Sequence, residues 1–130
     1  MRILIADDHQ DAALSLADLL GTLMNEQVTT TVAFDGTQAV EAAEARRPDV
    51  ALLDIGMPKM DGLMAAHRVR QLYGRQVVIA AMSGQQEHVL AALESGDFDY
   101  AFRKPLSAEQ LSQLMKATAA ALENRARCSR

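Results

Sequence analysis

The sequence has little of what marks secreted or membrane-bound proteins. It has a single cysteine, Cys128, so no intramolecular disulfide can form and a reducing cytoplasm is the simplest compartment. The longest apolar run covers only residues 77–82, which is too short to cross a bilayer. Two aspartates interrupt the apolar amino terminus before it reaches the length of a signal peptide. We therefore expect a soluble, cytoplasmic protein.

A surplus of basic or aromatic residues is also missing. Lysine and arginine total 13 against 17 acidic residues, which gives a formal net charge of −4, and aromatic residues make up 4% of the chain. Surfaces that bind nucleic acid or anionic lipid are usually strongly basic. We therefore expect protein partners, with no direct contact to nucleic acid or membrane.

The sequence does contain short apolar runs that alternate with longer stretches of helical period. Its 130 residues, 49% of them hydrophobic, supply the material for one domain with its own core. Five runs are predicted to be strands: residues 3–6, 29–33, 50–53, 77–81 and 100–102. The alternation predicts an α/β fold, a three-layer (βα)5 doubly wound parallel sheet. Threonines in the run 29–33 suit an edge strand.

Two apolar stripes predict amphipathic helices that pack on this sheet. The stripes consist of Leu16, Leu19, Leu20 and Leu23, and of Leu111, Leu114, Met115, Ala119 and Leu122. Asp35 and Ser107 are predicted to cap the helices that follow them, and Gln110 completes a capping box with Ser107.

Charged and polar side chains follow four of the five predicted strands. Asp7 and Asp8 follow the first strand, Asp54 the third, Ser83 the fourth and Lys104 the fifth. Because functional groups of a doubly wound sheet gather beyond the carboxyl ends of its strands, we expect these five residues to converge. Three carboxylates in one place repel one another without a cation, and an all-oxygen ligand set favours Mg²⁺.

The same residues suit phosphate chemistry. Lys104 can place a positive charge on a phosphoryl oxygen, and Ser83 can donate a hydrogen bond to another. A carboxylate beside the metal can itself accept the phosphoryl group. Such a transfer mainly requires positioning and charge neutralisation, which these groups provide.

The motifs around these residues resemble the receiver domain of two-component response regulators. The block DIGMPKMDG, which starts at Asp54, carries most of the likeness, and DD at 7–8, SG at 83–84 and KP at 104–105 complete it in order. The resemblance covers nearly the whole chain, from about Arg2 to Leu122. It implies a flavodoxin-like, or CheY-like, strand order 2-1-3-4-5, with a receiver domain over residues 1–124 and a polar tail over residues 125–130.

The resemblance assigns a role to each chemical position. It places the phosphoacceptor at Asp54, a direct Mg²⁺ ligand at Asp8, a ligand acting largely through water at Asp7, and a backbone ligand at the Gly56 carbonyl. It identifies Ser83 as the hydroxyl that moves to the phosphoryl group.

Further positions match the family's lysine and loops. Lys104 matches the lysine of the motif, and Pro105 matches a proline whose peptide bond is usually cis. Met57 and Pro58 match a turn that shapes the loop after the phosphoacceptor. Gly62 matches the glycine that opens the third helix.

One position departs from the family pattern. An aromatic switch residue usually lies three positions before the lysine, and here Ala101 stands there, flanked by Tyr100 and Phe102. The segment before Lys104 has one residue more than expected. A bulge or a shifted loop would restore Tyr100 or Phe102 as the switch residue.

Other groups receive structural interpretations. His9, His67 and His88 match no metal-ligand spacing and are expected to face solvent on helices. Asp61 is expected to have a structural role, at the end of a strand or as a helix cap, and the scattered methionines are expected to fill the core. The arginines near the carboxyl end are expected to lie in a frayed, solvated tail.

Three functions fit these observations. The first is a receiver whose Asp54 takes a phosphoryl group from a sensor histidine kinase or histidine phosphotransfer protein. Phosphorylation then switches the binding of a downstream protein. Such a receiver is not an enzyme, apart from autophosphatase activity at most. The second is a small metal-dependent phosphohydrolase of aspartyl-phosphate type. Such enzymes usually have a second acid where this chain has Gly56, and a cap for which it has no room. The third is a degenerate receiver that acts as an adaptor, which retention of all five chemical positions disfavours.

Overall fold

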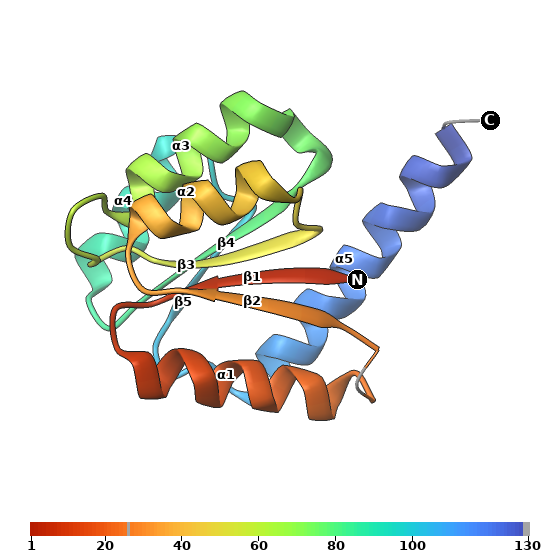
Figure 1. The fold of residues 1–130 in the computed structure, drawn as a ribbon, viewed down its shortest axis with the longest axis horizontal. Helices are drawn as coiled ribbons and strands as arrows, with labels where there is room; N and C mark the ends of the chain where they lie inside the picture. The colour runs from red at the N-terminus through yellow and green to blue at the C-terminus, as the bar shows by residue number, and fades with distance from the viewer. Residues whose placement is uncertain (26, 129–130) are drawn as a thin grey trace.

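The chain forms a parallel sheet whose strands alternate with helices (Figure 1). The computed structural model describes residues 1–25 and 27–128, the last three by their backbone alone. Each predicted strand is present within two residues of its expected bounds. In chain order the elements are β1 (Arg2–Ala6), α1 (Gln10–Leu23), β2 (Thr29–Ala33), α2 (Gly36–Ala45), β3 (Val50–Asp54), α3 (Gly62–Tyr73), the short 3-10 helix η1 (Gly74–Gln76), β4 (Val78–Ser83), α4 (Gln86–Ser95), β5 (Tyr100–Arg103) and α5 (Ala108–Cys128).

The strand order is β2-β1-β3-β4-β5, and every neighbouring pair is parallel. This confirms the doubly wound fold, with β2 as an edge strand. Asp54 pairs with Met82 at the end of β3, and Ser83 pairs with Arg103 at the end of β4. The strands therefore end at nearly the same level and present their last residues together at one edge.

Two apolar cores lie on opposite faces of the sheet. In Figure 1, α1 and α5 cover one face, and α2, α3 and α4 cover the other. Side chains alternate between the faces along each strand, so Ile3 and Ile5 pack in the core under α1 and α5 while Leu4 and Ala6 pack in the other. Burial on both faces explains why the central strands are apolar throughout.

The predicted helix caps are present. Asp35 Oδ1 accepts a hydrogen bond of 2.8 Å from the Gln38 amide at the start of α2. Asp61 caps α3 in the same way. At α5 the Ser107 hydroxyl accepts from the Gln110 amide, and the Gln110 side chain accepts from the Ser107 amide. This reciprocal pair is the expected capping box.

The carboxyl-terminal helix differs from expectation in two respects. The apolar stripe of α5 continues through Thr118, which is fully buried, whereas Ala119 is exposed. The hydroxyl of Thr118 is satisfied by donating to the Leu114 carbonyl, which is why a polar residue is tolerated there. The helix also runs to Cys128, so positions 125–128 of the expected tail are helical, and Arg125 donates to the Gln76 carbonyl. Residues 129–130 lie outside the described chain.

Arg70 ties together the opposite, amino-terminal edge of the sheet. Its guanidinium donates to the carbonyls of Gly74 and Val77 and forms an ion pair of 2.6 Å with Asp99, while its Nε donates to the Asp97 carbonyl. The Arg70 side chain is only 9% exposed. It therefore joins the end of α3 to the segments that enter β4 and β5.

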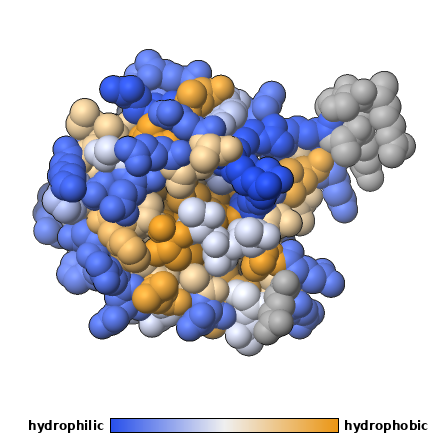
Figure 2. Space-filling view, in the orientation of Figure 1, coloured by the Kyte–Doolittle hydropathy of each residue, from blue (hydrophilic) through white to orange (hydrophobic). Residues whose placement is uncertain are grey.

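The face shown in Figure 2 is mostly polar at its margins, and apolar side chains gather over its lower middle, where β2 and α1 lie. Within the part of the chain that the structure describes, no helix is both long enough and apolar enough to span a membrane.

Candidate functional site

The carboxyl edge of the sheet brings together three of the residues singled out in the sequence. Asp7 follows β1, Asp54 ends β3 and Lys104 follows β5. The Lys104 Nζ atom lies 2.6 Å from Asp7 Oδ2 and 3.0 Å from Asp54 Oδ2. The two carboxylates are buried, with 3% and 9% of their side chains exposed, whereas Lys104 is 27% exposed. One ammonium thus bridges two buried acids.

This arrangement gives the two carboxylates different proton affinities. Burial is the largest single effect on the pKa of Asp7 and would raise it, but the hydrogen bond and charge of Lys104, together with the hydrogen bond from the His9 amide, outweigh burial and hold that pKa below its usual range. Burial raises the pKa of Asp54, and the longer bond from Lys104 only partly opposes it. Burial would lower the pKa of Lys104, yet its bonds to Asp7 and Asp54 raise it. Asp7 therefore holds its negative charge more firmly than Asp54.

Asp8 completes an acidic cluster that fits a divalent cation. One ligand atom from each of Asp7, Asp8, His9 and Asp54 lies within 4.8 Å of the others. Asp8 Oδ1 is buried and accepts no hydrogen bond from any described residue, although it lies 3.3 Å from His9 Nδ1. Carboxylate oxygens are the preferred ligands of hard cations. The donor set is thus consistent with Mg²⁺.

His9 adds a feature that the sequence interpretation missed. Its side chain is 77% exposed, as expected, but its Nδ1 lies 3.4 Å from Asp7 Oδ1 and 3.3 Å from Asp8 Oδ1. The His9 amide also donates to Asp7 Oδ1 at 3.0 Å. The sequence did contain a sign of this, because His9 directly follows Asp7 and Asp8 and so must lie close to them.

The loop after β3 packs tightly around Asp54. The Gly56 amide donates to Asp54 Oδ1 at 3.2 Å. Gly62 is the first residue of α3, as expected, and a Cβ there would lie 2.4 Å from the Asp54 carbonyl oxygen. Only glycine allows α3 to begin this close to the end of β3.

Ser83 lies at the same edge, but its hydroxyl is held by α4 and the turn before it. Its Oγ accepts a hydrogen bond of 3.1 Å from the Gln85 amide and forms a second bond of 2.9 Å with His88 Nδ1. Among the described residues, no hydrogen bond joins Ser83 to Asp54. The expectation that His88 simply faces solvent is wrong, because it is partly buried against Ser83. The helix that begins after Ser83 turns His88 back toward it, a contact that no ligand spacing reveals.

The aromatic residues before Lys104 lie on one face of β5. Tyr100 and Phe102 stack with their ring centroids 6.3 Å apart, and Phe102 packs in the core under α1 and α5. Ala101 packs in the opposite core. Pairing of β5 with β4 is continuous from Tyr100 to Arg103, so the bulge that would move an aromatic into the Ala101 position is not there. A switch role for Tyr100 or Phe102 stays a prediction.

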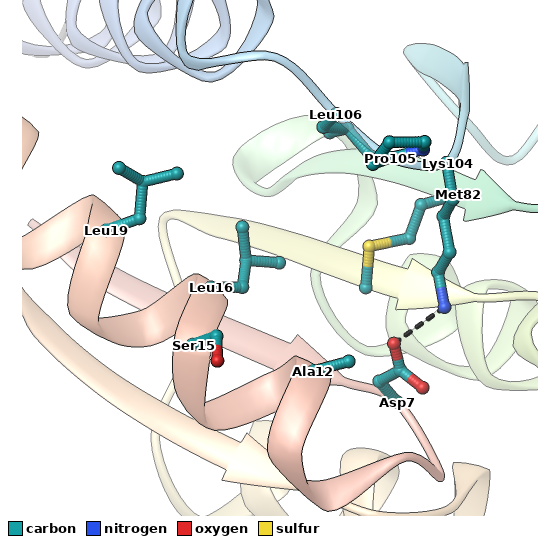
Figure 3. A pocket seen from close by; sticks show the side chains of 9 residues that line it. All are labelled: Asp7, Ala12, Ser15, Leu16, Leu19, Met82, Lys104, Pro105 and Leu106. Carbon is teal, nitrogen blue, oxygen red and sulfur yellow. Dashed lines mark hydrogen bonds and ion pairs between the residues drawn. The ribbon is translucent and has the colours of Figure 1, made fainter.

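A partly apolar hollow of about 290 Å³ opens beside the ion pair (Figure 3). Leu16 and Leu19 on α1 form one wall, and Leu106 in the loop before α5 forms another. The Lys104 side chain runs along the hollow and its ammonium reaches Asp7. The Lys104–Pro105 peptide bond is cis, as expected. The apolar walls keep the lysine stem covered while its charged end faces the acids.

The doubly wound fold and the acidic cluster at its edge are consistent with a phosphoacceptor domain, and comparison with known proteins agrees. The model of the response regulator receiver domain family matches residues 3–116. The chain belongs to this family. Receiver domains are signalling phosphoacceptors rather than enzymes, and they interact with histidine kinases and downstream targets. The family assignment favours a receiver over the phosphohydrolase.

Two relatives differ in how much of their own length the chain covers. The chain is 31% identical over 118 residues to the chemotaxis protein CheY of Bacillus subtilis, covering 90% of this chain and 96% of that protein. It is 38% identical over 117 residues to the DNA-binding response regulator MtrA of Mycobacterium tuberculosis, covering 89% of this chain but only 49% of that protein. The chain thus spans about half the length of the DNA-binding relative.

Solved structures agree with the fold. A response regulator receiver domain protein from Clostridium thermocellum superposes with a TM-score of 0.82 at 19% identity, over 94% of this chain and 96% of that one. The signal receiver domain of a DNA-binding response regulator from Colwellia psychrerythraea gives a TM-score of 0.81 at 26% identity, over 92% and 98%.

Proposed function

We propose that this chain accepts a phosphoryl group on Asp54 from a phosphohistidine of a sensor histidine kinase or histidine phosphotransfer protein. The observation that carries the proposal is the Lys104 ammonium bridging Asp7 and Asp54 at one end of an acidic cluster. A buried carboxylate with an adjacent cation and a second, more acidic carboxylate suits acceptance of a phosphoryl group better than it suits acid–base catalysis.

The transfer has a simple balance of bonds. A carboxylate oxygen of Asp54 forms a bond to phosphorus while the bond from phosphorus to the donor imidazole nitrogen breaks. The electron pair stays on that nitrogen, which takes up a proton. After the transfer, the Asp54 carboxylate is phosphorylated and its negative charge is replaced by the charge of the phosphoryl group. Lys104 can then bind a phosphoryl oxygen where it had bound the ionised Asp54 oxygen.

Asp8, Asp54, the Gly56 carbonyl and, through water, Asp7 are the proposed ligands of Mg²⁺. When bound, the cation neutralises negative charge on the phosphoryl group during transfer. Asp8 Oδ1 supports this assignment, because it is buried without a hydrogen bond, which is costly, and the exposed His9 ring lies 3.3 Å from it.

The phosphorylated form is proposed to bind a downstream protein differently from the resting form, in a reducing cytoplasmic compartment. Loss of the phosphoryl group by attack of water would return the chain to rest, which is the only autocatalytic step that we assign to it. Residues 1–124 are proposed as the receiver domain and the rest of the chain as an appended segment.

Incubation with acetyl phosphate and Mg²⁺ tests the phosphoacceptor. The intact protein should gain the mass of one phosphoryl group, and Asp54→Asn should gain none, because an amide cannot attack phosphorus. Asp97→Asn, which changes an acid on the loop before β5, is the matched control and should be labelled like the wild type. Equal labelling of Asp54→Asn and the wild type would sink the assignment of Asp54.

A thermal or urea unfolding titration tests the cation site. At Mg²⁺ concentrations 100 times the dissociation constant, mass action should raise the free energy of unfolding by about 2.7 kcal/mol. Asp8→Asn should lose most of that increase, whereas Asp97→Asn should keep it. If Mg²⁺ stabilises wild type and Asp8→Asn equally, the cation does not bind where we place it.

A further inference from the structure

The Ser83 hydroxyl is held by two partners on one side. It is buried, with 3% of the residue exposed, and it accepts from the Gln85 amide while bonding to His88 Nδ1. A hydroxyl has one hydrogen to donate and two lone pairs. The Gln85 bond uses one lone pair, and the His88 bond uses the hydrogen or the other lone pair, according to the imidazole tautomer. A turn of Ser83 toward Asp54 therefore breaks the bond to His88.

The His88 ring also lies against the loop that follows the phosphoacceptor. A Cβ placed on Gly56 would be 3.6 Å from His88 Cε1, so the imidazole lies beside the residue whose amide binds Asp54. His88 thus bonds to Ser83 at the end of β4 and lies beside Gly56 in the loop after β3. Its bond therefore links α4 to the strand end that carries Ser83.

We propose that His88 is a positioning residue that holds the Ser83 hydroxyl away from Asp54 and so resists phosphorylation. The inference rests on the proposed function, because it needs Asp54 to be the acceptor and Ser83 to bind the phosphoryl group. The resting state keeps the His88 bond, and the phosphorylated state gives it up. His88 therefore sets part of the balance between the two states.

Two substitutions separate the hydrogen bond from the shape of the ring. His88→Phe keeps a planar ring but cannot bond to Ser83, so the acetyl phosphate reaction should become about 2- to 10-fold faster, the factor expected for one net hydrogen bond. His88→Asn can place an amide group where Nδ1 stands, and it should restore the wild-type rate. His67→Phe, on α3, is the matched control and should leave the rate unchanged.

The effect should also require Ser83. In a Ser83→Ala background, adding His88→Phe should change the rate no further, because the bond that it removes is already gone. Imidazole nitrogen NMR provides a readout independent of rate. The His88 Nδ1 signal should move when beryllofluoride takes the place of a phosphoryl group on wild-type Asp54, and it should stay in place in Ser83→Ala.

The outcomes are distinct. If the wild type is labelled but His88→Phe reacts no faster, or if His88→Asn behaves like His88→Phe, the positioning role is wrong and the receiver function stands. If the wild type takes no phosphoryl group at all, both proposals fail. Circular dichroism of each variant confirms that it is folded before rates are compared.

Discussion

Lys104→Met should lower the free energy of unfolding of the metal-free protein by about 3 kcal/mol. Removing one partner of a buried ion pair leaves the other charge uncompensated, at a usual cost of about 3–5 kcal/mol. Here Asp7 and Asp54 both lose their cation. We expect a loss of unfolding free energy at the lower end of this range because Asp54, whose pKa is already raised by burial, can take up a proton and become neutral. Urea unfolding at neutral pH in the presence of a chelator measures it.

The pH dependence of this loss follows from the directions of the shifts. Lys104 helps to lower the pKa of Asp7 in the folded protein. This shift stabilises the fold at pH values above 3.8, the ordinary pKa of the residue, and the stabilisation is lost as the pH falls through the pKa of Asp7 in the folded state. The raised pKa of Lys104 stabilises the fold in full at pH values below 10.5, the ordinary pKa of lysine. This stabilisation is lost as the pH rises through the pKa of Lys104 in the folded state. The difference between wild type and Lys104→Met should thus be largest near neutral pH. A difference that grows toward pH 3 would contradict the bridging role.

Magnesium supplies a second test of the same variant. The cation brings positive charge to the carboxylates that Lys104 leaves, so Mg²⁺ should stabilise Lys104→Met at least as much as the wild type. Met is a suitable replacement because its side chain retains the length and apolar character of the lysine stem beside Leu16 and Leu106.

Gly62→Ala should destabilise the protein by about 2–3 kcal/mol. The new Cβ would lie 2.4 Å from the Asp54 carbonyl oxygen and 2.9 Å from Ile55 Cα, which are backbone atoms that no side-chain rotation can move. Overpacking of this kind usually costs about 1–3 kcal/mol, and two backbone contacts place it at the upper end. Because α3 must shift away from β3, phosphorylation of Asp54 should slow as well. Thermal unfolding and acetyl phosphate labelling measure the two effects.

Gly21→Ala is the matched control for this substitution. Gly21 lies inside α1, and a Cβ there would meet no atom within 4 Å. Alanine in a helix interior is favoured over glycine by roughly 0.5–1 kcal/mol, so this variant should be more stable than the wild type. Destabilisation by both substitutions would show that the close approach at Gly62 is not what matters.

The sheet and most of the site are encoded in local patterns. Apolar runs such as residues 50–53 and 77–81 give the strands, and the acids and lysine after them are brought together by parallel strand order alone. The capping box at Ser107 and Gln110 was equally readable, because its partners are three residues apart.

The contacts that the sequence did not reveal depend on tertiary packing. His88 reaches Ser83 only because α4 begins at Gln86 and turns its side chain back over the edge. Tyr100 and Phe102 lie on the same face of β5 because this strand pairs with β4 without a bulge. The number of residues before Lys104 could not show whether a bulge was present. Thr118 replaces Ala119 in the buried stripe because the Leu114 carbonyl satisfies its hydroxyl.

The Arg70 contacts described above give the two ends of the sheet unequal freedom. Four hydrogen bonds from one guanidinium clamp the entrances of β4 and β5, so those ends act as a fixed anchor. At the exits of the same strands, Ser83 and Lys104 bond to the site and its surroundings: Ser83 to His88, and Lys104 to Asp7 and Asp54. We therefore expect a perturbation that starts at Asp54 to move the strand exits, with Ser83 and the helix α4 bonded to it, more than the anchored entrances.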